Sequence, residues 1–102
     1  MNKAALKKRA ENRPLLPIEG VEEYFIKELT LEELQGFAQI EGTLPMNTFI
    51  FQKMVCDVDG IFLLDADETF EMLAPSITPM DLDKIGVAVE AVMNPAKKKN
   101  MT

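Results

Sequence analysis

An acidic turn in the middle of the chain holds the side chains best suited to chemistry. Asp57 and Asp59 alternate with an apolar residue and run into Gly60. In an EF-hand calcium loop these three residues would occupy positions 3, 5 and 6. Positions 1 and 12 would then fall on Val55 and Ala66, whose side chains have no ligand atoms. We therefore predict that this turn binds no metal ion and that calcium does not stabilise the protein.

The same acids have a second chemical interpretation. The run VCDVDGIF resembles the first motif of haloacid-dehalogenase-type phosphatases, in which an apolar strand leads into D-x-D-G. The resemblance implies that Asp57 is a nucleophile and Asp59 an acid/base. That fold also needs a wide doubly wound sheet, a later Ser or Thr, a Lys and a further acidic pair, and only 42 residues follow Gly60. The phosphatase stays an alternative.

A structural role accounts for these acids without catalysis. Asp side chains bond to nearby backbone amides in turns, and Gly accepts a positive φ. After the apolar run 61–64, Asp65 is suited to cap a helix, with Glu68 at its third position, where an acid meets unpaired amides. We predict a tight turn at 57–60 and a short helix over residues 66–73.

The composition limits the classes of function. The chain has no histidine and one cysteine, Cys56. Without histidine, no Ser/His or Cys/His pair exists, and the usual zinc and iron ligand sets cannot be assembled. A single cysteine forms no internal disulfide, which fits a reducing cytoplasm. No apolar run approaches the ~20 residues of a membrane span. The composition therefore excludes these catalytic pairs and these metal sites.

Charge is unevenly distributed along the chain. The net charge is −6, but residues 1–13 carry +4 and Lys97, Lys98 and Lys99 add +3, so residues 14–96 carry −13. Such an acidic body should repel nucleic acid, because phosphate binding depends on clustered cations. We predict a flexible basic tail over 1–13, one helical domain over 14–94, and a second flexible basic tail over 95–102.

The apolar pattern predicts an α+β domain that is predominantly helical, with four or so helices and a small β element near the N-terminus. Residues 21–26 alternate as a strand does, and 61–64 is the candidate partner unless that run stays unpaired. The T-x-x-E sequence from Thr30 is a capping box that opens a helix to about Glu41, with Gly42 placed to end it.

Two further helices are predicted after this one. Pro45 suits the first turn of a helix that runs to about Cys56, and Thr78 caps a last helix that runs to about Met93. The helix from Pro45 is apolar on most of its surface, so it is either the core helix or an element that also meets a partner. Its partner-binding candidates are Met46, Phe49, Ile50, Phe51, Met54 and Val55.

The order of these signals is similar to that of the tail assembly chaperones of long-tailed bacteriophages, over roughly residues 20–94. The matching residues are Glu28, Leu29, Thr30, Val55, Asp57, Asp59, Gly60, Leu63, Leu64, Asp65, Phe70, Leu73, Ile85 and Val89. The resemblance implies a small helical protein of the host cytoplasm that is not an enzyme and has no catalytic residue and no cofactor. It implies that the protein binds and solubilises the tape measure protein and helps to recruit tail tube subunits. A generic protein adaptor is the other binding alternative.

The resemblance also implies self-association, since some of these chaperones form spirals. The acidic body and basic tails, together with the helix over residues 46–56 that is apolar on most faces, also favour a head-to-tail contact, which gives a ring or an open spiral. Many members of the family are made in two lengths by a ribosomal frameshift. An A-rich slippery run encoding Lys97, Lys98 and Lys99 is the place to look for one here.

Overall fold

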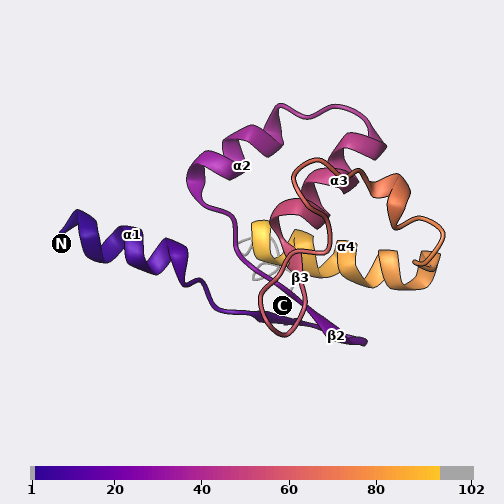
Figure 1. Ribbon diagram of the computed structural model, residues 1–102, viewed down its shortest axis with the longest axis horizontal. Helices are drawn as coiled ribbons and strands as arrows, with labels where there is room; N and C mark the ends of the chain where they lie inside the picture. Colours follow the sequence, from indigo (N-terminus) through magenta and orange to yellow (C-terminus); the bar gives the residue numbers. More distant parts are fainter. Residues whose placement is uncertain (1, 95–102) are drawn as a thin grey trace.

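The computed structural model describes residues 2–94, which combine helices with a small antiparallel sheet (Figure 1). The predicted α+β class is confirmed. In chain order the elements are α1 (Lys3–Glu11), β1 (Leu16–Ile18), β2 (Val21–Ile26), α2 (Leu31–Ala38), α3 (Thr43–Lys53), β3 (Val55–Cys56), the 3-10 helix η1 (Phe70–Met72) and α4 (Pro79–Met93).

The sheet has the order β1-β2-β3, and both pairings are antiparallel. Gly20, with φ of 87°, makes the turn between β1 and β2. The predicted strand at 21–26 is confirmed, but its neighbours are β1 and β3. The run 61–64 is therefore not its partner. It meets the sheet at β3, where Phe62 forms a bridge with Cys56 and the amide of Leu63 donates to the carbonyl of Val55 at 3.2 Å.

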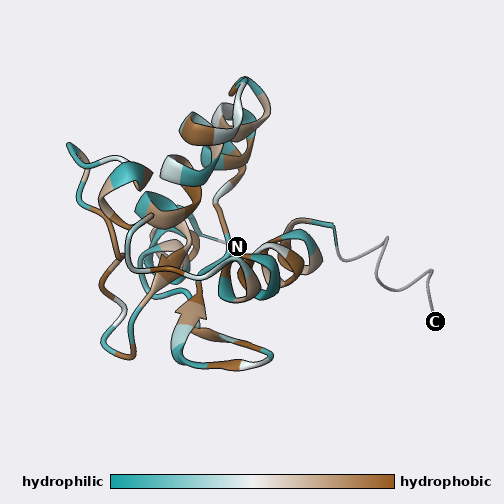
Figure 2. Ribbon diagram, turned by 90° about the vertical axis from the view of Figure 1, so that its right-hand side faces the viewer, coloured by the Kyte–Doolittle hydropathy of each residue, from teal (hydrophilic) through white to brown (hydrophobic). Residues whose placement is uncertain are grey.

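The core lies where α3 and α4 pack against this sheet. Brown and teal segments alternate along the helices, as expected for elements that bury one face (Figure 2). The buried apolar residues are Ile18, Val21, Ile26, Phe51, Met54, Val55, Leu64, Phe70, Ile85 and Val89. They come from β1, β2, α3, β3, η1, α4, the residue between α3 and β3, and the loop at residue 64, so the core joins both halves of the chain.

The helix α3 ends at Lys53, so its predicted extension to Cys56 is wrong. The backbone amide of Met54 still bonds to the carbonyl of Ile50 at 2.8 Å, and the chain then becomes extended. Val55 and Cys56 pair with Ile26 and Phe25 of β2, and their side chains are fully buried. Sheet pairing and burial thus override the helical pattern at these residues.

The helix predicted at 66–73 is replaced by turns and the short η1. The amide of Asp65 does bond to the carboxylate of Glu68 at 2.7 Å. The side-chain amide of Gln52 donates to the carbonyls of residues 65, 66 and 68, which would accept backbone amides if this segment were helical. The amide of Phe70 donates to the hydroxyl of Thr48 at 2.9 Å. Contacts with α3 therefore hold this segment in a non-helical path.

The predicted last helix is confirmed as α4, and the predicted capping box is confirmed at the start of α2. Thr78 accepts from the amide of Asp81 at 3.2 Å, with Pro79 in the first turn. The helix α2 is shorter than predicted and ends at Ala38 instead of about Glu41. Gly42, with φ of 97°, caps the start of α3 and does not end α2.

The N-terminal helix α1 extends away from the rest of the molecule (Figure 1). The side chain of Asn2 caps it by accepting from the amide of Ala5 at 2.7 Å, and none of its residues is buried. The flexibility predicted for residues 1–13 stays a prediction. The second predicted tail, 95–102, and the three lysines within it lie outside the described residues.

Candidate binding surface

The acidic turn has the local bonding that the sequence predicts. The Oδ1 atom of Asp57 accepts from the amides of Asp59 at 2.9 Å and Ile61 at 3.1 Å. Gly60 has φ of 79°, and its amide donates to the carbonyl of Asp57 at 2.9 Å. One carboxylate oxygen of Asp57 is thus already used to hold the turn.

The geometry around this turn gives no support to metal or phosphatase chemistry. Within residues 2–94, no group of three or more Cys, Asp or Glu side chains is arranged to hold a metal ion. The antiparallel sheet is not the doubly wound scaffold that the phosphatase resemblance requires. Burial raises the pKa of the Cys56 thiol above its ordinary value of 9.0, which disfavours the nucleophilic thiolate.

Half of the predicted partner-binding residues are buried inside the molecule. Phe51, Met54 and Val55 have no exposed surface, so none of them contacts a partner in this conformation. Ile50 is half-buried and packs against the core. The remaining candidates, Met46 and Phe49, are half-buried on α3 outside the core.

One exposed apolar surface involves α2, which the sequence-based candidates did not include. The ring of Phe37 on α2 lies 5.4 Å from the ring of Phe49, and no residue of α2 is buried. Leu31 is 71% exposed and Leu34 is 37% exposed. We call Leu31, Leu34 and Phe37 of α2, together with Met46 and Phe49 of α3, the α2–α3 surface. Apolar periodicity could have identified the face of α2, but it does not distinguish a face that meets the core from one that meets a partner.

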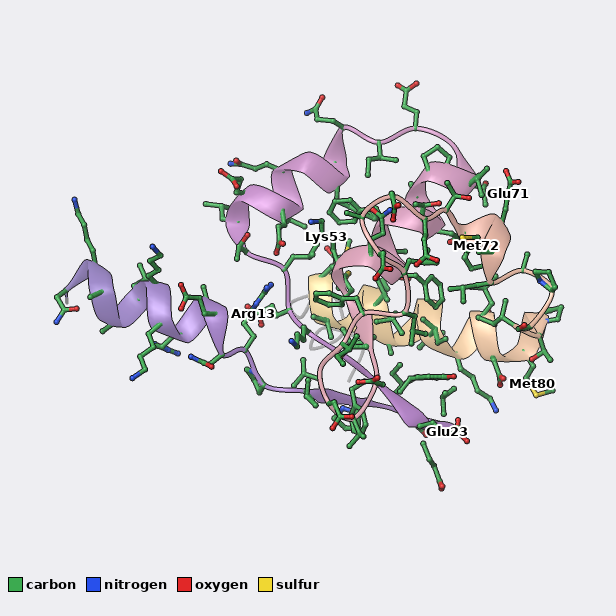
Figure 3. The ribbon with its side chains drawn as sticks, in the orientation of Figure 1. Arg13, Glu23, Lys53, Glu71, Met72 and Met80 are labelled. Carbon is green, nitrogen blue, oxygen red and sulfur yellow. The ribbon has the colours of Figure 1, made fainter. Side chains whose placement is uncertain are left out.

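Polar contacts fix the first turn of α2 although its apolar face is not buried. The hydroxyl of Thr30 accepts from the amide of Glu33, and the carboxylate of Glu33 accepts from the amide of Thr30 at 3.0 Å. The guanidinium of Arg13 pairs with the same carboxylate at 3.0 Å and donates to the carbonyl of Glu28. Arg13 thus joins the end of α1 to the start of α2 (Figure 3).

These contacts set the ionisation of Glu33. Partial burial raises the pKa of its carboxyl, but the hydrogen bond from the Thr30 amide and the neighbouring Arg13 charge lower it by more. The pKa of Glu33 therefore lies below its ordinary value of 4.5. The ionised form is the one that caps α2 and binds Arg13.

Two open grooves lie beside α2. One, of about 410 Å³, is lined by Glu33 of α2, by Gln52 and Lys53 of α3, and by residues 60–62 and 64–66. The other, of about 230 Å³, lies between the start of α2 and the end of α4 and is mostly apolar. Its lining residues are Glu28, Leu29, Leu34, Val92 and Met93. We call this second one the α2–α4 groove.

Comparison of the chain with protein-family models, with curated proteins and with solved structures finds no match. Among residues 2–94, no helix has both the length and the apolar character needed to cross a membrane.

Proposed function

We propose that this protein is a phage tail assembly chaperone that binds apolar helical segments of the tape measure protein and keeps them soluble. The single observation that carries the proposal is that α2 is an amphipathic helix without a buried residue. An amphipathic helix is normally stabilised by burying its apolar face against another element. Here that face is left for a partner, and a helix of a client protein would cover it by the same packing.

The chemistry of the α2–α3 surface suits reversible binding. Leucine, methionine and phenylalanine side chains adapt to different apolar partners, and burial contributes about 25 cal/mol for each Å² removed from water. Five side chains make a small surface, so the client is released when a tail tube subunit covers the same segment with a larger interface. The net charge of −6 keeps the chaperone and its complex dispersed in solution.

The direct experiment measures binding of the full chain to a fragment of the tape measure protein encoded in the same genome. Leu31→Gln should weaken the binding by about tenfold, the equivalent of about 1.4 kcal/mol. The matched control is Met80→Gln, because Met80 is 68% exposed against 71% for Leu31 and lies away from α2 at the right of Figure 3. This control should leave the affinity unchanged.

Two outcomes would contradict the proposal. One is an unaltered chain that neither binds the fragment nor raises its soluble yield on co-expression. The other is a genome without a long, helical-repeat tape measure gene beside this one. If Leu31→Gln and Met80→Gln lower the affinity for the fragment equally, then the protein binds the fragment but not through the α2–α3 surface.

A further inference from the structure

The helix α1 is a projecting arm that, within residues 2–94, buries none of its residues and forms no ion pair. It carries four basic side chains against one acidic side chain, whereas residues 14–94 have a net charge of −13. Leu6 is its one large apolar residue and is 55% exposed. Lys3 and Arg9 lie three residues before and after Leu6, so all three share one face of the helix. The arm therefore presents one apolar side chain between two cations.

The α2–α4 groove has the complementary chemistry. Its floor is apolar, with Leu29, Leu34, Val92 and Met93, and the exposed Glu28 lies at its edge. The acidic Glu32 follows on the first turn of α2. A volume of about 230 Å³ accommodates a leucine side chain but not a whole helix. A helix that inserts one leucine and places cations on the rim matches this groove.

The arm does not fill the groove of its own chain. Arg13 ties the end of α1 to Glu28 and Glu33, and Leu6 lies seven residues before Arg13, or about 10 Å along a helix axis. Figure 1 shows α1 pointing away from both α2 and α4. The lining of the groove comes only from α4, α2 and the segment before α2. An arm from another molecule has no such restriction.

We propose that α1 of one copy docks into the α2–α4 groove of a second copy, with Leu6 in the groove and Lys3 and Arg9 beside Glu28 and Glu32. Arm and groove are different surfaces of the same chain, so an open assembly of any length keeps one free arm at one end and one free groove at the other. The contact is small, and contacts below ~1,200 Å² are typically transient, so assembly should grow with protein concentration. This proposal does not depend on the identity of the client.

The test is sedimentation velocity of the full chain from about 5 to about 500 µM, the range in which transient contacts associate. The unaltered protein should form species larger than a monomer as the concentration rises. Leu6→Gln in the arm and Leu34→Gln in the groove should each weaken this association by at least about tenfold. Leu31→Gln is the matched control, because Leu31 is exposed on α2 but does not line the groove.

Mixing the two defective variants gives the sharper result. A Leu6→Gln copy retains a groove and a Leu34→Gln copy retains an arm, so an equimolar mixture should form a one-to-one dimer and nothing larger. Arg9→Glu and Glu28→Arg should each weaken assembly, and the double variant should recover part of it. Circular dichroism of each variant confirms that the fold is retained.

Three results would overturn the proposal. They are a protein that remains monomeric throughout the concentration range, a mixture of the two variants that remains monomeric, and assembly that Leu31→Gln weakens as much as Leu6→Gln does. The third result would show that the contact between copies lies on the exposed face of α2 and not in the α2–α4 groove.

Discussion

The ring of Phe37 lies 5.4 Å from the ring of Phe49, at an interplanar angle of 59°, and this contact joins α2 to α3 outside the core. Phe51, two residues further along α3, points into the core instead and is fully buried. The helix α3 therefore packs against the core with one side and against α2 with another. Since α2 adds no buried residue, it can open without disturbing the core.

Truncating the two phenylalanines of α3 one at a time should distinguish the side of the helix that packs in the core from the side that packs against α2. Phe51→Ala removes a ring with no exposed surface and should lower the free energy of unfolding by about 3–5 kcal/mol, the usual cost of such a cavity. Phe49→Ala loses mainly the ring pair with Phe37, which is worth about 1 kcal/mol. Denaturant melts of both variants measure the difference. Equal losses would contradict the assignment of Phe49 to a contact outside the core.

The two threonine caps should behave differently although their geometry is alike. Thr78→Ala should lower the free energy of global unfolding by about 1 kcal/mol. The reason is that α4 carries the buried Ile85 and Val89. Thr30→Ala should mainly speed amide exchange within α2, because that helix is not part of the core. If Thr30→Ala shifts the global melt as far as Thr78→Ala does, then α2 is more tightly coupled to the core than its burial indicates.

Low pH should loosen α2 through Glu33. The pKa of this carboxyl is lowered in the folded state, so its stabilisation is present above the unfolded pKa and is lost as the pH falls through the folded value. At neutral pH, α2 amides should exchange faster in Glu33→Gln than in the unaltered chain. The ratio of the two rates should approach one as the pH falls to about 3. A ratio that is constant from neutral to acid pH would show that ionised Glu33 does not stabilise the helix.

The hydroxyl of Thr48 should be needed to hold η1 against α3. Thr48→Val keeps the shape but leaves the amide of Phe70 without its acceptor, which should cost about 1–2 kcal/mol because Phe70 is only 9% exposed. Thr43→Val, at the exposed first turn of the same helix, is the control and should change stability much less. Equal stability of the two variants would show that the hydrogen bond between Thr48 and Phe70 does not hold η1 against α3.

The sequence predicted the elements whose signals are local. The caps at Thr30 and Thr78 and the turn at Asp57 depend on side chains within three or four residues of the backbone groups they bind. Such bonds form whenever the chain has the right order of residue types. The fold class follows from these elements together with the alternation at 21–26.

The incorrect predictions depend on contacts between distant residues. Val55 continues the apolar pattern of α3, but its position is decided by pairing with Ile26 of β2, far away in the chain. The helix expected at 66–73 is prevented by Gln52 and Thr48, which bind backbone groups of that segment from α3. The burial of Phe51, one of the predicted partner-binding residues, was missed for the same reason, because periodicity does not reveal which apolar face the core covers.

Amide hydrogen exchange of the full chain, with and without a tape measure fragment, tests whether the exposed face of α2 binds the client. We expect the amides of residues 34–38 in α2 to become protected when the fragment binds, while those of Ile85 and Val89 in α4 do not change. Protection confined to α4 or the sheet, or a fragment that binds without slowing exchange in α2, would contradict the claim that the exposed face of α2 receives the client.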